Sequence, residues 1–164
     1  MHHTVSTLGD TPHGTRCVHV CVPHSPTITL MVGFPVGSAD ESSTERGYAH
    51  IVEHAAFTAY NTQRVPVNAT GAALGAAFNA STSVDTTLFH VSALPAAAPQ
   101  LLKLFHDMLF THDITPDGVA VEAYPIMNEY LMNLQRPTAH ALTTLMASVY
   151  GRHSPQLFVP IIGS

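Results

Sequence analysis

Charged residues are scarce in this sequence. Asp, Glu, Lys and Arg make up only 10% of its 164 residues, where about 25% is usual for a soluble domain. With so few charged residues, part of the protein surface must be apolar. We infer that another chain or domain buries part of that surface. The formal net charge is −5, and basic residues do not cluster. This balance argues against a nucleic-acid backbone and against an anionic membrane surface as partners.

Long hydrophobic runs are also missing. No apolar stretch approaches the roughly 20 residues that a membrane-spanning helix needs. The first residues, MHHTVSTLGDTPHG, lack the apolar core of a signal peptide. We therefore expect no membrane association and a cytoplasmic location.

Cysteine occurs only twice. Cys17 and Cys21 lie in Thr15–Val22, TRCVHVCV, a run rich in β-branched residues that predicts a strand. Four residues of a strand span about 13 Å, which is too long for a disulfide. Both side chains would face the same side of the strand, and we expect them to be small core residues.

Apolar residues nevertheless make up 46% of the chain, enough for one domain with a real core. Alternating apolar residues predict strands, and a wider apolar spacing predicts helices. The expected strands are 15–22, 27–34, 78–83 and 86–94, and the expected helices are 47–59, 69–74, 95–110, 116 to about 135, and 138–150. We expect the first two strands to pair as a hairpin. The order predicts an α+β fold, with one mostly antiparallel sheet, helices packed on one face and a single domain over residues 1–164.

The most informative motif is H-x-x-E-H, within GYAHIVEHAAFT at Gly47–Thr58. His50 and His54 are four positions apart, so on a helix both imidazoles share a face and can reach one metal ion. Glu53 projects beside them, close enough to accept a proton from water at that metal. Catalytic zinc sites use three protein ligands, one open position and a nearby base. The other interpretation is two histidines on a helix face and a solvated glutamate.

Further segments surround this motif in a fixed order. They are PVGSADE (Pro35–Glu41) before it, GAAFNASTSVDTTLFHVSAL (Gly75–Leu94) after it, then VEAYPIMNEY (Val121–Tyr130), YGRHSP (Tyr150–Pro155) and PIIG (Pro160–Gly163). Together they resemble the inverzincin zinc metallopeptidases of the pitrilysin type, the family of insulin-degrading enzyme and the mitochondrial processing peptidase. The resemblance extends from about Thr7 to the end of the chain.

This resemblance implies a role for each residue of the motif. His50, His54 and Glu129 would bind zinc, and Glu53 would be the general base that activates water. Glu122 would not bind the metal itself. Its carboxylate would accept a hydrogen bond from the ring N–H of a histidine ligand and so orient that histidine. On the residues alone, Glu129 could also be a solvated helix carboxylate.

Two further residues leave alternatives open. By resemblance, Asn79 would lie on the strand that lines the cleft and bind substrate backbone, but a turn or strand-end position fits it equally. Pro125 lies between Glu122 and Glu129, and a proline inside a helix removes a backbone hydrogen bond. Either the helix starts afresh near Tyr124, which would move Glu122 off its regular face, or the helix bends there.

The implied activity is zinc-dependent hydrolysis of peptide bonds in extended peptides, which dock against an exposed sheet edge. Family members combine several such domains into two halves. We expect this chain to be a truncated N-terminal, metal-bearing peptidase domain with Zn²⁺ as cofactor, completed by a second peptidase half or by a further copy of itself. The alternatives are a catalytically incomplete half that binds or supports a partner, and a zinc enzyme that acts on a non-peptide amide.

Overall fold

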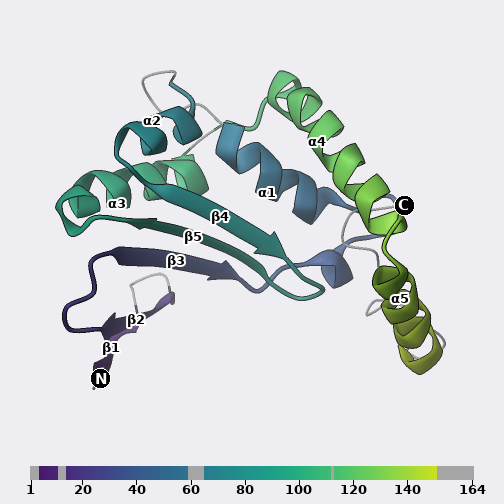
Figure 1. Cartoon of the computed structure of the whole chain (residues 1–164), viewed down its shortest axis with the longest axis horizontal. Coiled ribbons are helices and arrows are strands. Elements are labelled where there is room, and N and C mark those ends of the chain that lie inside the picture. The colour runs from purple at the N-terminus through teal and green to yellow at the C-terminus, as the bar shows by residue number, and fades with distance from the viewer. Residues whose placement is uncertain (1–3, 11–13, 59–64, 112, 151–164) are drawn as a thin grey trace.

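A three-stranded antiparallel sheet lies at the centre of the fold. The computed structural model describes residues 4–10, 14–58, 65–111 and 113–150. The strands are ordered β3 (Ile28–Phe34), β5 (Thr87–Ala93), β4 (Ala77–Thr82), so that β4 lies at an edge (Figure 1). Residues of β5 alternate between buried and partly buried, because its side chains point alternately to the core and to the open sheet face. The predicted α+β class with an antiparallel sheet is confirmed.

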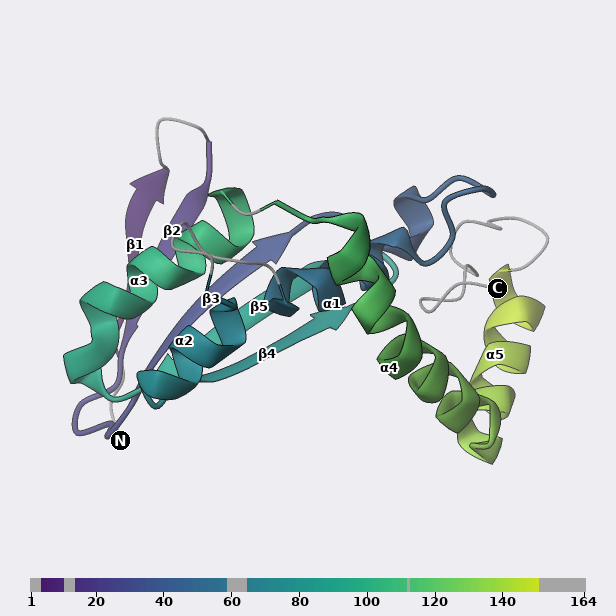
Figure 2. The same ribbon diagram turned by 90° about the horizontal axis from the view of Figure 1, so that it is seen from above.

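Helices cover one face of this sheet. Figures 1 and 2 show α1 (Tyr48–Thr58), α2 (Val67–Ala73) and α3 (Ala98–His106) over it, and α3 continues into a π-helical turn, η3 (Asp107–Thr111). The buried apolar residues of this layer are Ala56, Val67, Phe89, Val91, Ala93, Leu101, Leu104, Phe105 and Met108. Burying one large apolar side chain contributes about 1.5–3 kcal/mol. This core fixes the position of α1 over the sheet.

The N-terminal hairpin differs from the prediction. β2 (Arg16–Cys21) pairs with β1 (Thr4–Asp10), and the two form a separate small sheet. β3 pairs with β5 instead, so the hairpin predicted between β2 and β3 is wrong. Most of β2 is exposed. Cys17 is partly buried and Cys21 is exposed, so their predicted place in the core is wrong as well.

Two helices follow the sheet layer. α4 (Pro116–Leu134) contacts α1, and α5 (Pro137–Tyr150) contacts α4. Thr115 caps α4, because its hydroxyl accepts a hydrogen bond from the N–H of Gly118 at 3.1 Å. Pro125 lies inside α4, and the helix does not restart there. Glu122 therefore stays on the regular helix, with Glu129 two turns later on the same face.

Short turns complete the described chain. They include η1 (Ser38–Asp40) and η2 (Pro95–Ala97). The segment between the predicted helices 47–59 and 69–74 is described only from residue 65 on, and PIIG and all of YGRHSP except Tyr150 lie outside the described residues. In the described ranges, no helix has both the length and the apolar character to cross a membrane.

Candidate metal centre

The helix that carries the histidine motif begins at a capped end. Gly47 has a positive φ of 89°, a conformation that glycine adopts without strain. The Glu41 carboxylate accepts hydrogen bonds from the backbone N–H groups of Gly47, at 2.7 Å, and Ala49, at 2.8 Å. N–H groups at a helix start lack partners inside the helix, so this carboxylate satisfies them and complements the helix dipole. Glu41 thereby fixes the start of α1 just ahead of His50.

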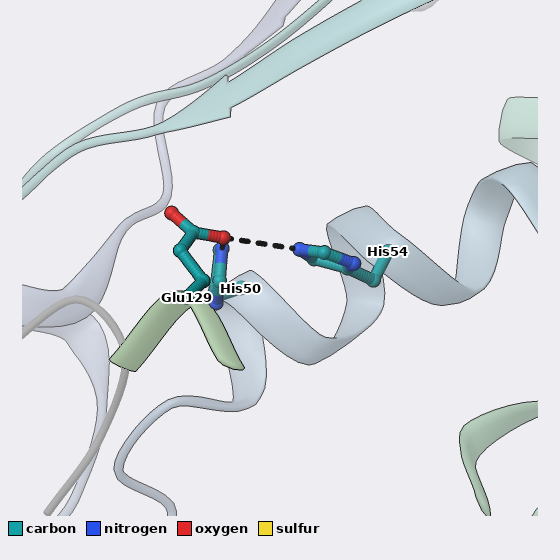
Figure 3. Close-up of side chains that lie close together, drawn as sticks. All are labelled: His50, His54 and Glu129. Carbon is teal, nitrogen blue, oxygen red and sulfur yellow. Dashed lines mark ion pairs between the residues drawn. The ribbon is translucent and has the colours of Figure 1, made fainter. Parts of the chain in front are cut away.

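His50 and His54 project from one face of α1. Their ring centroids lie 4.6 Å apart, as expected for residues one turn apart. α4 brings Glu129 to the same place, where its Oε2 lies 3.5 Å from Nε2 of His50 and 3.7 Å from Nε2 of His54 (Figure 3). The structure thus brings together the three residues that the resemblance assigns as ligands.

Glu122 contacts the other ring nitrogen of His54. Its Oε2 lies 3.0 Å from Nδ1 of His54. An ionised carboxylate only accepts hydrogen bonds, so this contact favours the tautomer with a proton on Nδ1. Nε2 then presents its lone pair toward Glu129. This is the geometry that the predicted orienting role of Glu122 requires.

His50 is nearly buried, with 5% of its surface exposed. Burial lowers the pKa of His50 below its usual value and the neighbouring His54 lowers it further, while the Glu129 and Glu53 carboxylates oppose the shift. A lowered pKa keeps the imidazole neutral at neutral pH, which is the state that binds a metal. Its Nδ1 is buried without a hydrogen-bond partner in the part of the chain that the structure describes.

Glu53 lies at the contact between α1 and the sheet. The residue is buried, with 8% of its surface exposed, and it influences the pKa of His50 through its charge. The hydroxyl of Thr82, the last residue of β4, donates a hydrogen bond to Oε2 of Glu53. The carboxylate therefore has a fixed neighbour on the edge strand and lies beside the two histidines.

The donor set fits a zinc ion. One ring nitrogen of each histidine and one oxygen of Glu129 all lie within 4.8 Å of one another, close enough to share one ion. Two imidazole nitrogens and one carboxylate oxygen are a set that catalytic zinc sites use. The Glu129 side chain is 47% exposed, so the group is open to solvent on that side. An open position distinguishes a catalytic zinc site from a closed structural one.

Asn79 lies outside this group of side chains. It is on the edge strand β4, opposite His90 of β5. Phe78 and Ala80 on either side of it pack against the core, so Asn79 projects from the opposite, exposed face of the sheet. Its Oδ1 accepts a hydrogen bond from the N–H of Ala80 at 2.9 Å. The structure therefore does not bring the Asn79 side chain to the candidate metal centre.

Two residues that position the site, Glu41 and Thr82, are not among those predicted. Glu41 ends the segment PVGSADE ahead of the motif helix, and an acidic residue near a helix start is a signal that could identify it. Thr82 shares a strand face with Phe78, so alternation could place it on the helix side. Nothing local in the sequence shows that it reaches Glu53.

The sequence matches a known peptidase family. The family profile described as "Insulinase (Peptidase family M16)" matches residues 18–159. The chain belongs to this family. An uncharacterised zinc protease of Mycobacterium tuberculosis is 30% identical to it over 156 residues, which cover 93% of this chain and 35% of the relative. A probable mitochondrial-processing peptidase subunit beta of Schizosaccharomyces pombe is 31% identical over 108 residues, 65% of this chain and 24% of the relative.

Two solved structures share the fold. A protease from Helicobacter pylori superposes with a TM-score of 0.80 and 24% identity, over 99% of this chain and 38% of its own. A peptidase M16 inactive domain from Pseudomonas fluorescens gives a TM-score of 0.80 and 21% identity, over 98% and 39%. The resemblance drawn from the motifs is confirmed at the level of the M16 family and its fold. The chain spans only about a third of the length of the curated M16 relatives that match most of it.

A separate cavity of about 440 Å³ lies against another side of α1 in this M16 chain. Its walls are mostly apolar and include Phe34, Val52, Phe89 and Leu109. The residues of the candidate metal centre do not line it.

Proposed function

We propose that this chain is the metal-bearing part of a zinc-dependent metalloendopeptidase that hydrolyses peptide bonds in extended peptides. The observation that carries the proposal is the convergence of His50, His54 and Glu129, from two helices, with Glu53 buried on the same motif helix. Membership of the M16 family and relatives named zinc proteases support it. The chain would form the N-terminal peptidase domain of this enzyme and work in the cytoplasm.

Each residue of the centre has a role in this proposal. His50, His54 and Glu129 would hold the zinc ion. A bound zinc ion polarises a carbonyl group and lowers the pKa of water. Glu53 would act as the general base and accept the proton of the attacking water. Glu122 would hold the Nδ1 proton of His54 and so keep Nε2 available as a ligand.

The proposed substrate would pair with the edge of the sheet. Within the described sheet, β4 has a neighbouring strand on one side only. An extended peptide could add there as a further strand, through main-chain hydrogen bonds to the free edge of the strand that carries Asn79. The Thr82 contact with Glu53 places this edge next to the proposed base. Main-chain pairing is largely independent of the substrate's side chains, which suits a peptidase that acts on extended segments.

A second polypeptide would complete the cleft, either a second peptidase half or another copy of this chain. The low charge content of 10% supports this part of the proposal. So does a set of exposed large apolar side chains on α4 and α5, since single exposed residues are ordinary but grouped ones mark contact surfaces. These residues are Val121, Tyr124, Met127, Leu131, Met132, Leu134, Leu142, Leu145 and Val149.

Peptide turnover tests the proposal. The chain, alone and with a candidate second half, is incubated with internally quenched peptides before chelation, after chelation and after zinc is added back. We expect turnover that disappears on chelation, returns with zinc and is absent in Glu53→Gln. Turnover that persists through chelation, or that survives in Glu53→Gln, contradicts the proposal.

A second candidate is a half that binds peptide or supports a partner without catalysis. The exposed Glu129 favours it, because its carboxylate contacts both histidines from the solvent side and is the ligand least fixed by packing. Peptide binding without turnover, in the presence of both zinc and the second half, would establish this candidate. A screen of non-peptide amides covers the remaining possibility, a zinc amidase.

A further inference from the structure

The proposed base, Glu53, is held by a neutral donor from a different element. Glu53 lies on α1, whereas Thr82 ends β4, and the two residues are 29 positions apart. In the described part of the chain, the Thr82 hydroxyl is the one side-chain donor to this carboxylate. A buried carboxylate needs a hydrogen-bond partner, because burial without one is unfavourable.

The strand pattern explains why Thr82 reaches Glu53. Phe78, Ala80 and Thr82 alternate along β4 and share the face that packs toward the helices. Phe78 and Ala80 pack against the core, but Thr82 lies at the strand end, where α1 crosses the sheet. Thr82 is paired in register with Thr87 of β5, whose hydroxyl donates instead to the backbone carbonyl of Val36 at 2.8 Å.

We propose that Thr82 is a positioning residue for Glu53. The inference rests on the proposed function of Glu53 as the base. Glutamate has several rotatable bonds, and fixing one of its oxygens removes much of that freedom. The hydroxyl binds Oε2 and leaves Oε1 to accept a proton. Because the donor is a neutral hydroxyl, it orients the carboxylate without adding a charge to the site.

The contact also joins the base to the strand on which the substrate would add. Glu53 and the edge of β4 are then parts of one rigid unit, and the orientation of the carboxylate relative to a peptide on that edge does not depend on a mobile loop. A small misplacement of a catalytic group is enough to slow a reaction substantially.

Thr82→Val tests this role, because valine keeps the shape of threonine and lacks the hydroxyl. We expect kcat for peptide turnover to fall about tenfold or more, with KM and zinc content unchanged. Thr82→Ser, which restores a hydroxyl, should recover most of kcat. Thr87→Val is the matched control, since it removes the paired hydroxyl of β5 that does not touch Glu53, and it should leave kcat near the wild-type value.

Infrared spectroscopy of the metal-free chain gives a second measurement that needs no activity. Loss of the Thr82 hydroxyl should shift a carboxylate stretching band in Thr82→Val, and the same substitution made in a Glu53→Gln background should show no such shift. An unchanged carboxylate band, or an active wild type whose kcat is unaffected in Thr82→Val, overturns the inference. Absence of turnover in the wild type and all its mixtures would overturn the proposed function, while the infrared shift would still decide the Thr82 contact.

Discussion

Nδ1 of His54 lies 3.0 Å from Oε2 of Glu122, across the contact between α1 and α4. This contact fixes the orientation of the imidazole ring. It also fixes which residues of α4 lie opposite which residues of α1. Glu129 lies two helical turns after Glu122, so the same contact that orients His54 brings Glu129 level with both histidines. One hydrogen bond thus links the positions of both the second and the third proposed ligand.

Glu53→Gln should abolish peptide turnover and leave zinc binding intact, because glutamine keeps the shape of glutamate but cannot accept the proton. General-base catalysis contributes roughly 10²- to 10⁴-fold, so a loss of that order is expected. Initial rates and elemental zinc content would be measured on the same samples. Glu45→Gln, at an exposed position ahead of α1, is the control and should keep its turnover. Retained turnover in Glu53→Gln would exclude Glu53 as the base.

Glu129→Ala removes a proposed ligand and should lower zinc affinity. The loss should exceed the roughly 10- to 100-fold that is typical when a residue hydrogen-bonded to a ligand is removed. Competition with a chromophoric chelator measures the dissociation constant. Asp117→Ala removes another carboxylate from the first turn of α4 and should leave the affinity unchanged. Equal affinity in Glu129→Ala and wild type would remove Glu129 from the set of ligands.

Glu122→Ala should weaken zinc binding by about 10- to 100-fold, because His54 loses the acceptor that holds its tautomer and orientation. Glu122→Gln keeps an amide oxygen that can accept the same N–H, so its loss should be smaller. The same chelator competition gives both constants. If the two variants bind zinc as tightly as the wild type, Glu122 does not orient the ligand.

Asp107 should make stability depend on pH at the acidic end. The Lys103 ammonium donates to the Asp107 carboxylate at 2.6 Å and lowers its pKa, and His106 lowers it further. A carboxylate whose pKa is lower in the folded state stabilises the fold above its unfolded pKa, and this contribution is lost as the pH falls through the folded pKa. Because Lys103 is mostly exposed, the pair is worth only about 0.5–1 kcal/mol.

Urea unfolding of the wild type and Asp107→Asn, at pH 7 and near pH 3, tests this dependence. The wild type should be more stable than Asp107→Asn at pH 7, and the difference should shrink at the acidic pH. A difference that is the same at both pH values would show that Asp107 acts through packing and not through its charge.

Gly37→Ala should destabilise the chain by about 1–3 kcal/mol or more. A Cβ atom on Gly37 would lie 2.4 Å from the carbonyl oxygen of Ser83 and 2.6 Å from backbone atoms of Val84, so the two segments would have to separate. That separation would also break the hydrogen bond from Ser38 N–H to Ser83 O. Gly33→Ala is the control, because its Cβ would meet only a Leu88 methyl at 3.6 Å. Equal thermal midpoints for the two variants would contradict the prediction.

Local spacing is enough to predict much of the centre. The four-residue spacing of His50 and His54 fixes their shared helix face wherever that helix packs. The position of Glu129 depends on how α4 docks against α1, and the sequence alone pointed to it only through the family resemblance. Pro125 made that docking harder to predict. The carbonyl that loses its helical partner at Pro125 belongs to Val121, a residue that is 65% exposed, so the missing hydrogen bond falls on the solvent-facing part of the helix.

Strand pairing was the least predictable feature. β2 and β3 are consecutive strands joined by a short turn, which favours a hairpin, yet β3 pairs with β5 through contacts that no local pattern reveals. β1 contains Gly9, which has a positive φ near a register shift, so its sequence gives a weak strand signal. The misassigned burial of Cys21 follows from the same error, since a strand outside the main sheet has no core to face.

The separation of the proposed ligands along the chain would have a consequence for biosynthesis. His50 and His54 leave the ribosome together, but Glu129 follows 75 residues after His54 and must wait for α4 to form. A nascent chain therefore offers two imidazoles and an incomplete site while β4, β5 and α3 are still being made. If these residues bind zinc, stable metal loading would belong to the finished fold, and zinc captured earlier would be exchanged easily with cellular chelators.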